Sequence, residues 1–368
     1  MPMDHDAVII GASFAGLACA TSLASRGARV AVLDGKQDAG EKLHTTGILV
    51  RDALDQVPLL DALPAHLVRR IERVRLYAPN LTYIDLAAPG YYFLATDTPG
   101  LMRWLAAEAS AAGARMMWGC RFKRARAISA GYDLGASYGA TRVLVGADGP
   151  HSAVARALGL GVNSRFLTGI EHEYADAPID ADDRLHCFID RRLMPGYIGW
   201  VLKGVGITQV GLARRALGDG LDVNAAMQRF LLKIAPLFDF AGSELVGVRA
   251  GLIPCGGVVH PVACTRALLI GDAAGLVSPL TGGGIHRALE HGARAGHVVA
   301  DFLEGRGEEL GVWAAREYPR FRVKRALRFV FDRWQRDWVF DWLLGSSAMR
   351  LLASEIYFKR RGTAIQSL

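Results

Sequence analysis

The sequence predicts an α/β fold in which a parallel, nucleotide-binding sheet is joined to an antiparallel sheet and to helices at the C-terminal end. Three observations support this prediction. Short apolar runs end in glycine-containing turns at three places far apart in the chain, apolar and polar residues alternate in its middle part, and helical spacing returns toward its end. The 368 residues, 51% of them hydrophobic, are enough for more than one domain.

The N-terminal element carries a dinucleotide fingerprint. An apolar strand over residues 7–10 runs into a turn and an Ala- and Leu-rich helix, and a second apolar strand over residues 30–33 ends in an acid. In such a unit the helix start binds pyrophosphate and the acid bonds to a ribose. Ser13 stands where the middle glycine is usual, and its hydroxyl can itself donate to a phosphate oxygen. The candidate residues are Gly11, Ser13, Phe14, Ala15, Gly16, Asp34, Gly35 and Lys36.

Two later segments again place an acid and glycines after a buried strand. Residues 143–145 lead to Gly146-Ala147-Asp148-Gly149, and residues 267–270 lead to a longer turn that opens a helix. Glycines let a flat ligand approach the main chain, and a helix start favours negative charge. The acid of the longer turn accepts bonds from hydroxyls, so that turn suits a flavin. The candidate residues are Asp148, Gly149, Gly271, Asp272, Pro279, Gly282, Gly283, Gly284 and Ile285.

The segments between these turns complete the two sheets. Residues 55–98 carry strands and turns, residues 99–112 read as a helix, and residues 115–128 return as a strand. From Phe166 to about Val248 the alternating pattern predicts a second, largely antiparallel domain. The chain then re-enters the first domain and finishes in helices.

These motifs resemble those of the FAD-dependent oxidoreductases of the p-hydroxybenzoate hydroxylase fold, and within them the geranylgeranyl reductase family. The resemblance covers about residues 5–300. It implies FAD as the cofactor and a Rossmann-like FAD-binding domain of the GR2, or p-hydroxybenzoate hydroxylase, type. We therefore expect the FAD-binding domain over residues 1–165 and 249–300, an antiparallel substrate-binding domain over residues 166–248, and a helical region over residues 301–368.

The resemblance also implies further residues near FAD. The loop at residues 42–47 stands where the family commonly has a cysteine followed by glycines, so His44, Thr45 or Thr46 has to replace that cysteine. Residues 97–98 are Asp-Thr where the family has an arginine. The residues expected near FAD from these segments are Thr46, Gly47, Arg51 and Arg103.

The segment Gly196–Gly204 resembles the strand that forms the family's substrate wall, without its usual proline. Tyr197 and Trp200 are therefore expected in that wall. A reduction also needs a proton, for which Tyr197, His44, His286 or a water is a candidate source. Each of these side chains also has a purely structural interpretation. The residues expected to take part in catalysis are Tyr197, Trp200 and His44.

The expected activity is reduction of a carbon–carbon double bond in an apolar, isoprenoid-like substrate by hydride transfer from N5 of the reduced flavin. Two alternatives stay open. One is a flavin-dependent aromatic hydroxylase, or monooxygenase, and the other is an FAD protein that carries electrons without turnover. No second nucleotide fingerprint is present, so either NAD(P)H docks transiently or a separate electron-donor protein, such as a reductase or ferredoxin, supplies electrons.

Composition excludes several other classes. The five cysteines are widely spaced, have no paired metal-ligand spacing and follow no secretion signal, which predicts reduced thiols, no metal site and a cytoplasmic protein. The net charge of +7 comes mostly from cations interspersed with acids. Since no nucleic-acid-binding signature accompanies it, we expect no nucleic-acid partner.

The stretch Arg316–Arg336 is the exception, because it holds eight Lys or Arg residues interleaved with aromatic ones. Two interpretations are open. The one that we favour is a pair of helices whose aromatic stripe packs on the protein while the cations face water. The other is a peripheral membrane contact, in which an interfacial helix touches anionic lipid. No apolar run has the length needed to span a bilayer.

Overall fold

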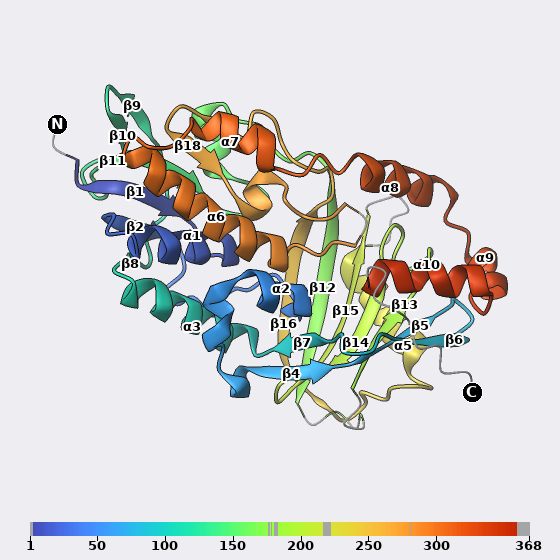
Figure 1. Ribbon diagram of the computed structural model, residues 1–368. Helices are drawn as coiled ribbons and strands as arrows, with labels where there is room; N and C mark the ends of the chain where they lie inside the picture. Colours follow the sequence, from blue (N-terminus) through green and yellow to red (C-terminus); the bar gives the residue numbers. More distant parts are fainter. Residues whose placement is uncertain are drawn as a thin grey trace.

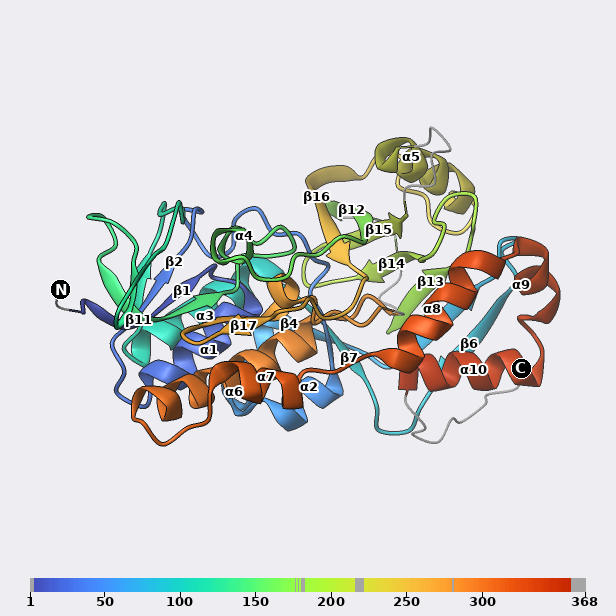
Figure 2. The ribbon, with the colours of Figure 1, turned by 90° about the horizontal axis from the view of Figure 1, so that it is seen from above.

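The computed structural model describes residues 3–358, except for residues 176, 178, 180–182, 216–221 and 280. In this part of the chain the strands form sheets of eight, seven and three strands. Figures 1 and 2 show the two large sheets toward opposite ends of an elongated molecule, with the C-terminal helices beside the second sheet. The predicted α/β class is confirmed.

The first sheet is parallel at its centre, as the apolar runs predicted. β1 (His5–Ile10) lies between β2 (Val30–Leu33) and β11 (Ala140–Gly146). β8 (Arg115–Met117) and β18 (Ala267–Leu269) extend the parallel pairing on the two sides. Because parallel strands are covered on both faces, their sequences are continuous apolar runs. The antiparallel strands at the rim are β9 (Arg126–Ile128), β10 (Gly131–Asp133) and β17 (Ala263–Cys264).

The prediction of one strand over residues 115–128 is wrong. This segment forms β8 and β9 with an irregular stretch between them. In that stretch the amides of Gly119 and Cys120 donate to the carbonyl oxygens of Lys36 and Asp34, at 2.7 and 2.8 Å, instead of to a neighbouring strand. These bonds fix the loop that follows β2.

Three helices cover the first sheet side by side, with α1 (Phe14–Ala24) between α3 (Thr98–Ala111) and α6 (Ile285–Leu303) (Figure 1). The helix predicted over residues 99–112 is thus confirmed as α3. α1 and α6 are in backbone contact, because a Cβ atom on Gly292 would lie 2.4 Å from the Ala15 carbonyl oxygen. The remaining helices of this part are α4 (Ala153–Leu158) and α7 (Leu310–Glu317).

The second sheet has the strand order β16–β12–β15–β14–β13–β5–β6 and is antiparallel except between β13 and β5. The two N-terminal strands β5 and β6 lie here although residues 1–165 were expected in the other domain, and β16 runs past residue 248. The bounds are β5 (Arg73–Tyr77), β6 (Tyr83–Ala87), β12 (Phe166–Ala175), β13 (Arg184–Phe188), β14 (Gly199–Lys203), β15 (Thr208–Arg214) and β16 (Glu244–Pro254).

Helix α5 (Val223–Ile234) covers one face of the second sheet. Its Phe230 is fully buried and meets the ring of Phe188 edge-on, in a core that also contains Ile170 of β12. Since side chains alternate along a strand, Glu171 points to the opposite face. That face looks toward the loop at residues 44–47.

A small sheet joins the two large ones. β7 (Phe93–Thr96) is its central strand, between β3 (Ile48–Val50) and β4 (Val68–Ile71). The loop at residues 44–47 runs directly into β3, so the sheet ties that loop to the rest of the protein. Short helices connect β3 to β4, namely α2 (Arg51–Gln56), Pro58–Ala62 and Ala65–Leu67.

Three further helices, α8 (Arg322–Trp334), α9 (Asp337–Leu343) and α10 (Ser347–Phe358), lie along the second sheet at the end away from β1 (Figure 2). Phe358 of α10 is fully buried beside Tyr91 and Phe93. No helix in the described part of the chain has the length and apolar character needed to cross a membrane.

The favoured interpretation of residues 316–336 holds for only part of the stretch. Tyr318 and Phe321 are buried, as it requires, but Phe329 is 71% exposed. The reason is that α8 turns Arg328, which is 4% exposed, toward the protein and leaves Phe329 on the outer side.

Candidate functional site

The glycine turn between β1 and α1 is packed backbone against backbone. Gly11 has φ +105° and a Cβ atom there would lie 2.4 Å from the Ala147 carbonyl oxygen, while a Cβ atom on Gly16 would lie 2.0 Å from the Gly11 carbonyl oxygen. Only glycine fits at these two positions. The tight turn leaves the first amides of α1, which have no intrahelical acceptor, as anion-binding donors at the end of β1.

Ser13 caps this helix. Its hydroxyl accepts from the Gly16 amide at 3.2 Å and donates to the Ala147 carbonyl oxygen at 3.0 Å. The hydroxyl hydrogen, which we expected to be free for a phosphate, is therefore used to bind the end of β11 in this structure. Ser13 replaces a glycine here without disturbing the turn.

Asp34 holds the same turn from the end of β2. Its Oδ2 accepts from the Ala12 amide at 2.7 Å and its Oδ1 from the Lys36 amide at 2.8 Å, with the Lys36 ammonium 3.8 Å away. A carboxylate has about four acceptor positions. Two of them thus remain for the ribose hydroxyls that the fingerprint predicts.

Asp148 stands at the end of β11 and caps α4. Its Oδ2 accepts from the amides of Ala153 and Val154 at 2.6 and 3.1 Å. Its Oδ1 is buried and has no hydrogen-bond partner among the described residues. The neighbouring Gly149 has open space around its Cα, so a ligand can approach the main chain there.

Asp272 is the acid of the third turn, in the short helix Gly271–Ala274 that follows β18. Burial raises the pKa of its carboxyl to about 6. No described residue donates a hydrogen bond to that carboxyl, which lies 3.6 Å from the position of a Cβ on Gly284, at the start of α6. A partly buried acceptor without a donor, beside a helix start, fits the ribityl hydroxyls of a flavin.

Residues 279–285 form the turn before α6, apart from Leu280, which lies outside the described residues. Pro279 is buried, and Gly282, Gly283 and Gly284 lead to Ile285, the first residue of the helix. A Cβ on Gly283 would meet only the Thr281 hydroxyl, at 3.4 Å. The backbone is therefore open at Gly283, whereas Tyr197 covers Gly282, and contact of this turn with a flat ligand stays a prediction.

The loop at residues 44–47 is fixed from one side by α3 and β7. Gly47 has φ +77°, and a Cβ atom there would lie 2.0 Å from the Thr98 hydroxyl and 2.5 Å from the Thr96 hydroxyl. The Thr96 hydroxyl donates to the Gly47 carbonyl oxygen at 2.7 Å, and the Thr98 hydroxyl donates to the Thr46 carbonyl oxygen at 3.3 Å. Thr98, which stands where an arginine was expected, therefore holds the loop.

Three residues of the second sheet that the sequence analysis missed hold the loop from the other side. Gln209 donates to the Thr46 carbonyl oxygen at 3.0 Å and to Glu171 at 3.1 Å. Arg249 donates to the Thr45 carbonyl oxygen at 2.9 Å and pairs with Glu173 at 2.5 Å. Alternation predicted strands at Glu171 and Gln209 but ended before Arg249, and only the register of β12, β15 and β16 brings the three to one loop.

Glu171 is a buried acid at the centre of this contact. It is 3% exposed and accepts from the Trp200 indole at 2.9 Å. Burial raises the pKa of its carboxyl, while hydrogen bonds from Thr46 and Trp200 and the charge of Arg249 act in the opposite direction. Glu171 therefore connects the loop expected at the flavin to the strand expected at the substrate.

Tyr197 and Trp200 belong to an apolar cluster, and their role in a substrate wall stays a prediction. Tyr197 donates its phenolic proton to the Thr281 carbonyl oxygen, and its ring packs on Gly282, where a Cβ atom would lie 2.4 Å from the phenolic oxygen. Burial raises the pKa of Tyr197. The cluster consists of Leu167, Tyr197, Trp200, Ala213, Ile253 and Cys255.

The two candidate histidines have other partners. His44 is exposed, and its Nδ1 lies 2.6 Å from the Ala250 carbonyl oxygen. The Nε2 atom of His286 lies 2.7 Å from Gln56 Oε1 on α2. Both contacts support the structural interpretation of these side chains, and the proposal of His44 as a proton source stays untested.

The two candidate cations are also paired within the protein. Arg103 of α3 bonds to Asp38 at 2.8 Å, in the loop that follows Asp34. Arg51, the first residue of α2, donates to the Gly90 carbonyl oxygen. Gly35, before that loop, packs under the side chain of Arg121. Contact of Arg51, Arg103 and Gly35 with FAD stays a prediction.

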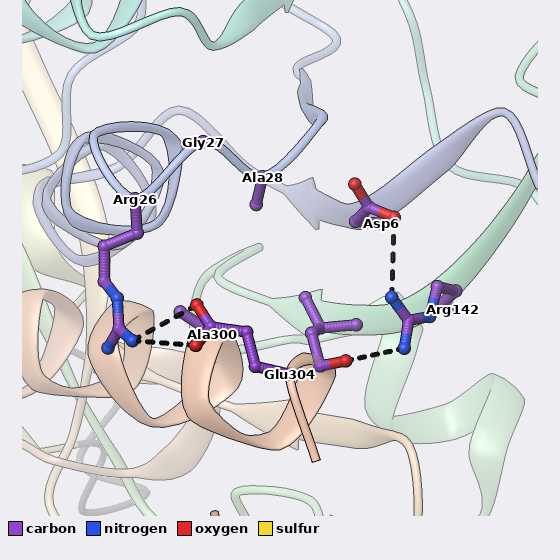
Figure 3. A pocket seen from close by; sticks show the side chains of 8 residues that line it. Asp6, Arg26, Gly27, Ala28, Arg142, Ala300 and Glu304 are labelled. Carbon is purple, nitrogen blue, oxygen red and sulfur yellow. Dashed lines mark hydrogen bonds and ion pairs between the residues drawn. The ribbon is translucent and has the colours of Figure 1, made fainter. Parts of the chain in front are cut away.

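A separate pocket of about 160 Å³ lies at the opposite edge of the first sheet (Figure 3). Arg26 pairs there with Glu304, and Arg142 bonds to Asp6 and to the Leu303 carbonyl oxygen. It lies at the start of β1, whereas ligands of parallel sheets bind at the carboxyl ends of strands. We therefore do not assign it to the nucleotide.

The described residues contain no group of His, Cys, Asp or Glu that could hold a metal ion, and the five cysteines are free thiols.

Comparison with known proteins identifies the nucleotide part of the chain. A family model described as an FAD binding domain matches residues 4–193. A digeranylgeranylglycerophospholipid reductase of Methanopyrus kandleri is 29% identical over 319 residues, which cover 82% of this chain and 78% of that protein. A protein of the same description from Methanothermobacter thermautotrophicus is 29% identical and covers 89% of this chain and 87% of its own.

Solved structures share the fold over almost the whole chain. A geranylgeranyl bacteriochlorophyll reductase-like protein of Thermoplasma acidophilum superimposes with a TM-score of 0.82 at 18% identity, covering 97% of both chains. The p-nitrophenol 4-monooxygenase of Pseudomonas putida superimposes with a TM-score of 0.72 at 15% identity, covering 98% of both chains. At sequence identities of 18% and 15%, this structural similarity shows a shared fold only.

The raised pKa of Asp272 predicts a pH-dependent stability of the flavin-free protein. A native state that holds the proton more tightly is most stable below the ordinary pKa of 3.8 and loses stability as pH rises through about 6. Asp272→Asn cannot ionise, so at about pH 8 we expect its free energy of unfolding to exceed that of the unmodified protein by about 1–2 kcal/mol. This value is smaller than the full pKa shift implies, because the Asp272 side chain is partly exposed to solvent.

Urea unfolding of both flavin-free proteins at about pH 4 and about pH 8 measures this difference. Asp61→Asn, at an exposed aspartate, is the control and should follow the unmodified protein. Equal pH dependence of Asp272→Asn and the unmodified protein would show that the Asp272 carboxyl is not buried in this way.

Proposed function

Because the chain belongs to the FAD binding domain family and is an FAD-dependent oxidoreductase, we propose that it reduces a carbon–carbon double bond of an apolar, isoprenoid-like substrate. The observation that carries the proposal is the apolar cluster around Tyr197 and Trp200, which borders the Gly282 turn. The similarity to reductases of digeranylgeranylglycerophospholipid over more than four fifths of the chain supports it.

The residues of the three turns are those that would hold FAD. The start of α1 would bind the pyrophosphate, Asp34 the ribose, and Asp272 with the turn before α6 the ribityl chain and the ring. When bound, the flavin supplies a hydride at N5. Tyr197 would hold the turn at residues 281–282 in place, since it donates to the Thr281 carbonyl oxygen.

The proton is best supplied by Glu171. The Tyr197 hydroxyl donates a hydrogen bond to the Thr281 carbonyl oxygen, and His286 is bonded to Gln56. Glu171, in contrast, is a buried acid between Thr46 and Trp200. Burial raises the pKa of Glu171 toward neutral pH, where a carboxyl can both donate and accept a proton. We expect Glu171 to act through the hydroxyl of Thr46.

An anaerobic assay tests the proposed activity. The flavin-loaded protein is reduced with dithionite, NADH or NADPH, and digeranylgeranylglycerophospholipid is added. Reduction predicts reoxidation of the flavin without oxygen and a product that has gained two hydrogens at each reduced double bond, seen by mass spectrometry. A phenol that becomes hydroxylated only when oxygen is admitted, with no reaction of the lipid, would instead support a monooxygenase. Reoxidation that neither substrate accelerates would support an electron carrier.

Replacement of Glu171 should slow proton delivery. We expect Glu171→Gln to lower kcat by about a hundredfold or more, the usual contribution of a positioned acid. The unmodified enzyme should also lose activity as pH rises through the pKa of Glu171, because the acid must be protonated, and the variant should lack this dependence. Glu244→Gln, at an exposed glutamate of the same sheet, is the control. An unchanged rate and pH profile would exclude Glu171.

We also propose that helices α8–α10 contact a lipid bilayer, at the cytoplasmic side where the protein is expected. Large apolar side chains are exposed on all three helices, and the cations of α8 suit an anionic surface. The exposed residues are Val323, Leu327, Phe329, Val330, Trp338, Trp342, Leu351, Leu352 and Ile356.

Co-sedimentation with phospholipid vesicles tests this surface. Trp338 and Trp342 are 67% and 77% exposed, so the double variant Trp338→Ser/Trp342→Ser should bind vesicles containing phosphatidylserine at least about tenfold more weakly. Leu232→Ser, at a 76% exposed leucine of α5, is the matched control and should bind normally. Equal sedimentation of the three proteins would contradict the proposal.

A further inference from the structure

A buried arginine close to Tyr197 has two terminal nitrogens without hydrogen-bond partners among the described residues. Arg328 of α8 is 4% exposed, and neither Nη1 nor Nη2 has a partner among the described residues. Only its Nε is bonded, to Asp332 one helical turn further on, at 3.2 Å. Buried donors are almost always paired because unpaired ones cost free energy. An acceptor is therefore missing at the two terminal nitrogens.

A second unpaired donor lies at the same place. Gln335 is 3% exposed; its Oε1 accepts from the Gly196 amide at 2.9 Å, and its Nε2 has no partner among the described residues. A Cβ atom on Gly196 would lie 2.8 Å from Arg328 Nη2. Both side chains thus meet at Gly196, and their three unpaired nitrogens are all donors. The buried Oδ1 of Asp332 lies at the same place and forms an ion pair with Arg328 Nε at 3.0 Å. A group with several acceptor oxygens would satisfy the three nitrogens together.

The charge at this place favours an anion. Arg215 also pairs with Asp332, at 2.7 Å, so two guanidinium groups share one carboxylate. Among these three side chains a positive charge is left unbalanced. A guanidinium fork binds oxyanions through two parallel hydrogen bonds. The side chain of Arg215 is 31% exposed, so this group of charged side chains reaches the solvent.

Gly196 places Arg328 and Gln335 at the end of the apolar cluster around Tyr197 and Trp200. The next residue is Tyr197, whose pKa is raised by burial, while the charge of Arg328 acts in the opposite direction. Tyr197 belongs to the apolar cluster with Leu167 and Trp200 and touches the turn at Gly282. An apolar cluster that ends at a buried guanidinium with two unbonded nitrogens matches an amphiphile with a long hydrocarbon chain and an anionic head.

We propose that Arg328 and Gln335 form a head-group site that binds the phosphate of an isoprenoid substrate. The three unpaired nitrogens carry six N–H groups and can donate to the three terminal oxygens of a phosphate monoester. This inference rests on the proposed function, because it assigns the polar end of the same substrate.

Equilibrium binding tests the site without turnover. Flavin-loaded protein is titrated calorimetrically with geranylgeranyl phosphate, with geranylgeraniol, which has the same chain without the anion, and with inorganic phosphate. The unmodified protein should bind the prenyl phosphate about tenfold to a hundredfold more tightly than the alcohol. Arg328→Met should bind geranylgeranyl phosphate no more tightly than geranylgeraniol, and its affinity for geranylgeraniol should equal that of the unmodified protein. Arg126→Met, at an exposed arginine of β9, should keep the full preference.

Two conservative variants keep the test decisive if Arg328→Met does not fold. Arg328→Lys retains the charge without the fork, and Gln335→Leu removes one donor, so each should reduce the preference several-fold. An unmodified protein without preference for the phosphate, a preference that survives in these variants, or inorganic phosphate that binds as tightly as the prenyl phosphate would overturn the site. A preference in an enzyme that reduces no alkene would refute the proposed function alone.

Discussion

Contact of backbone with backbone around α1 is the constraint on which the nucleotide site depends. Gly11 lies against Ala147 at the end of β11, and Gly292 of α6 lies against Ala15, with no room for a side chain in either place. These contacts bring residues about 130 and 280 positions apart along the chain to the start of one helix. Since packed interiors tolerate almost no added volume, the turns hold their positions before any ligand binds.

The loop at residues 44–47 is a second joint, and it is made in a different way. Hydroxyls of Thr96 and Thr98 bind it from the nucleotide side, and Gln209 and Arg249 bind it from the second sheet. The two sheets therefore meet through polar side chains on the backbone of one loop. Hydrogen bonds of this kind are individually modest, but they are directional. They set the distance between the nucleotide-binding part and the second sheet.

The acids of the site show how structural and binding roles combine. Asp34 and Asp148 were expected as ligand contacts, yet each first accepts backbone amides of the protein. No described residue donates to the Asp272 carboxyl, and burial raises its pKa. An acid at the end of a buried strand can thus support a turn, contact a ligand or do both. The strand pattern that predicts its place in the sequence does not distinguish these roles.

Local sequence determined the parallel strands, the three glycine turns, helix α3 and the alternation of the second sheet. Each of these follows from neighbouring residues, through backbone conformation and the period of apolar side chains. Only the tertiary structure decided that β5 and β6 join the second sheet, that Glu171 and Gln209 reach Thr46, and that Arg328 is buried beside Gly196. The physical reason is that strand register and helix docking depend on contacts between residues far apart in the chain, which no local spacing encodes.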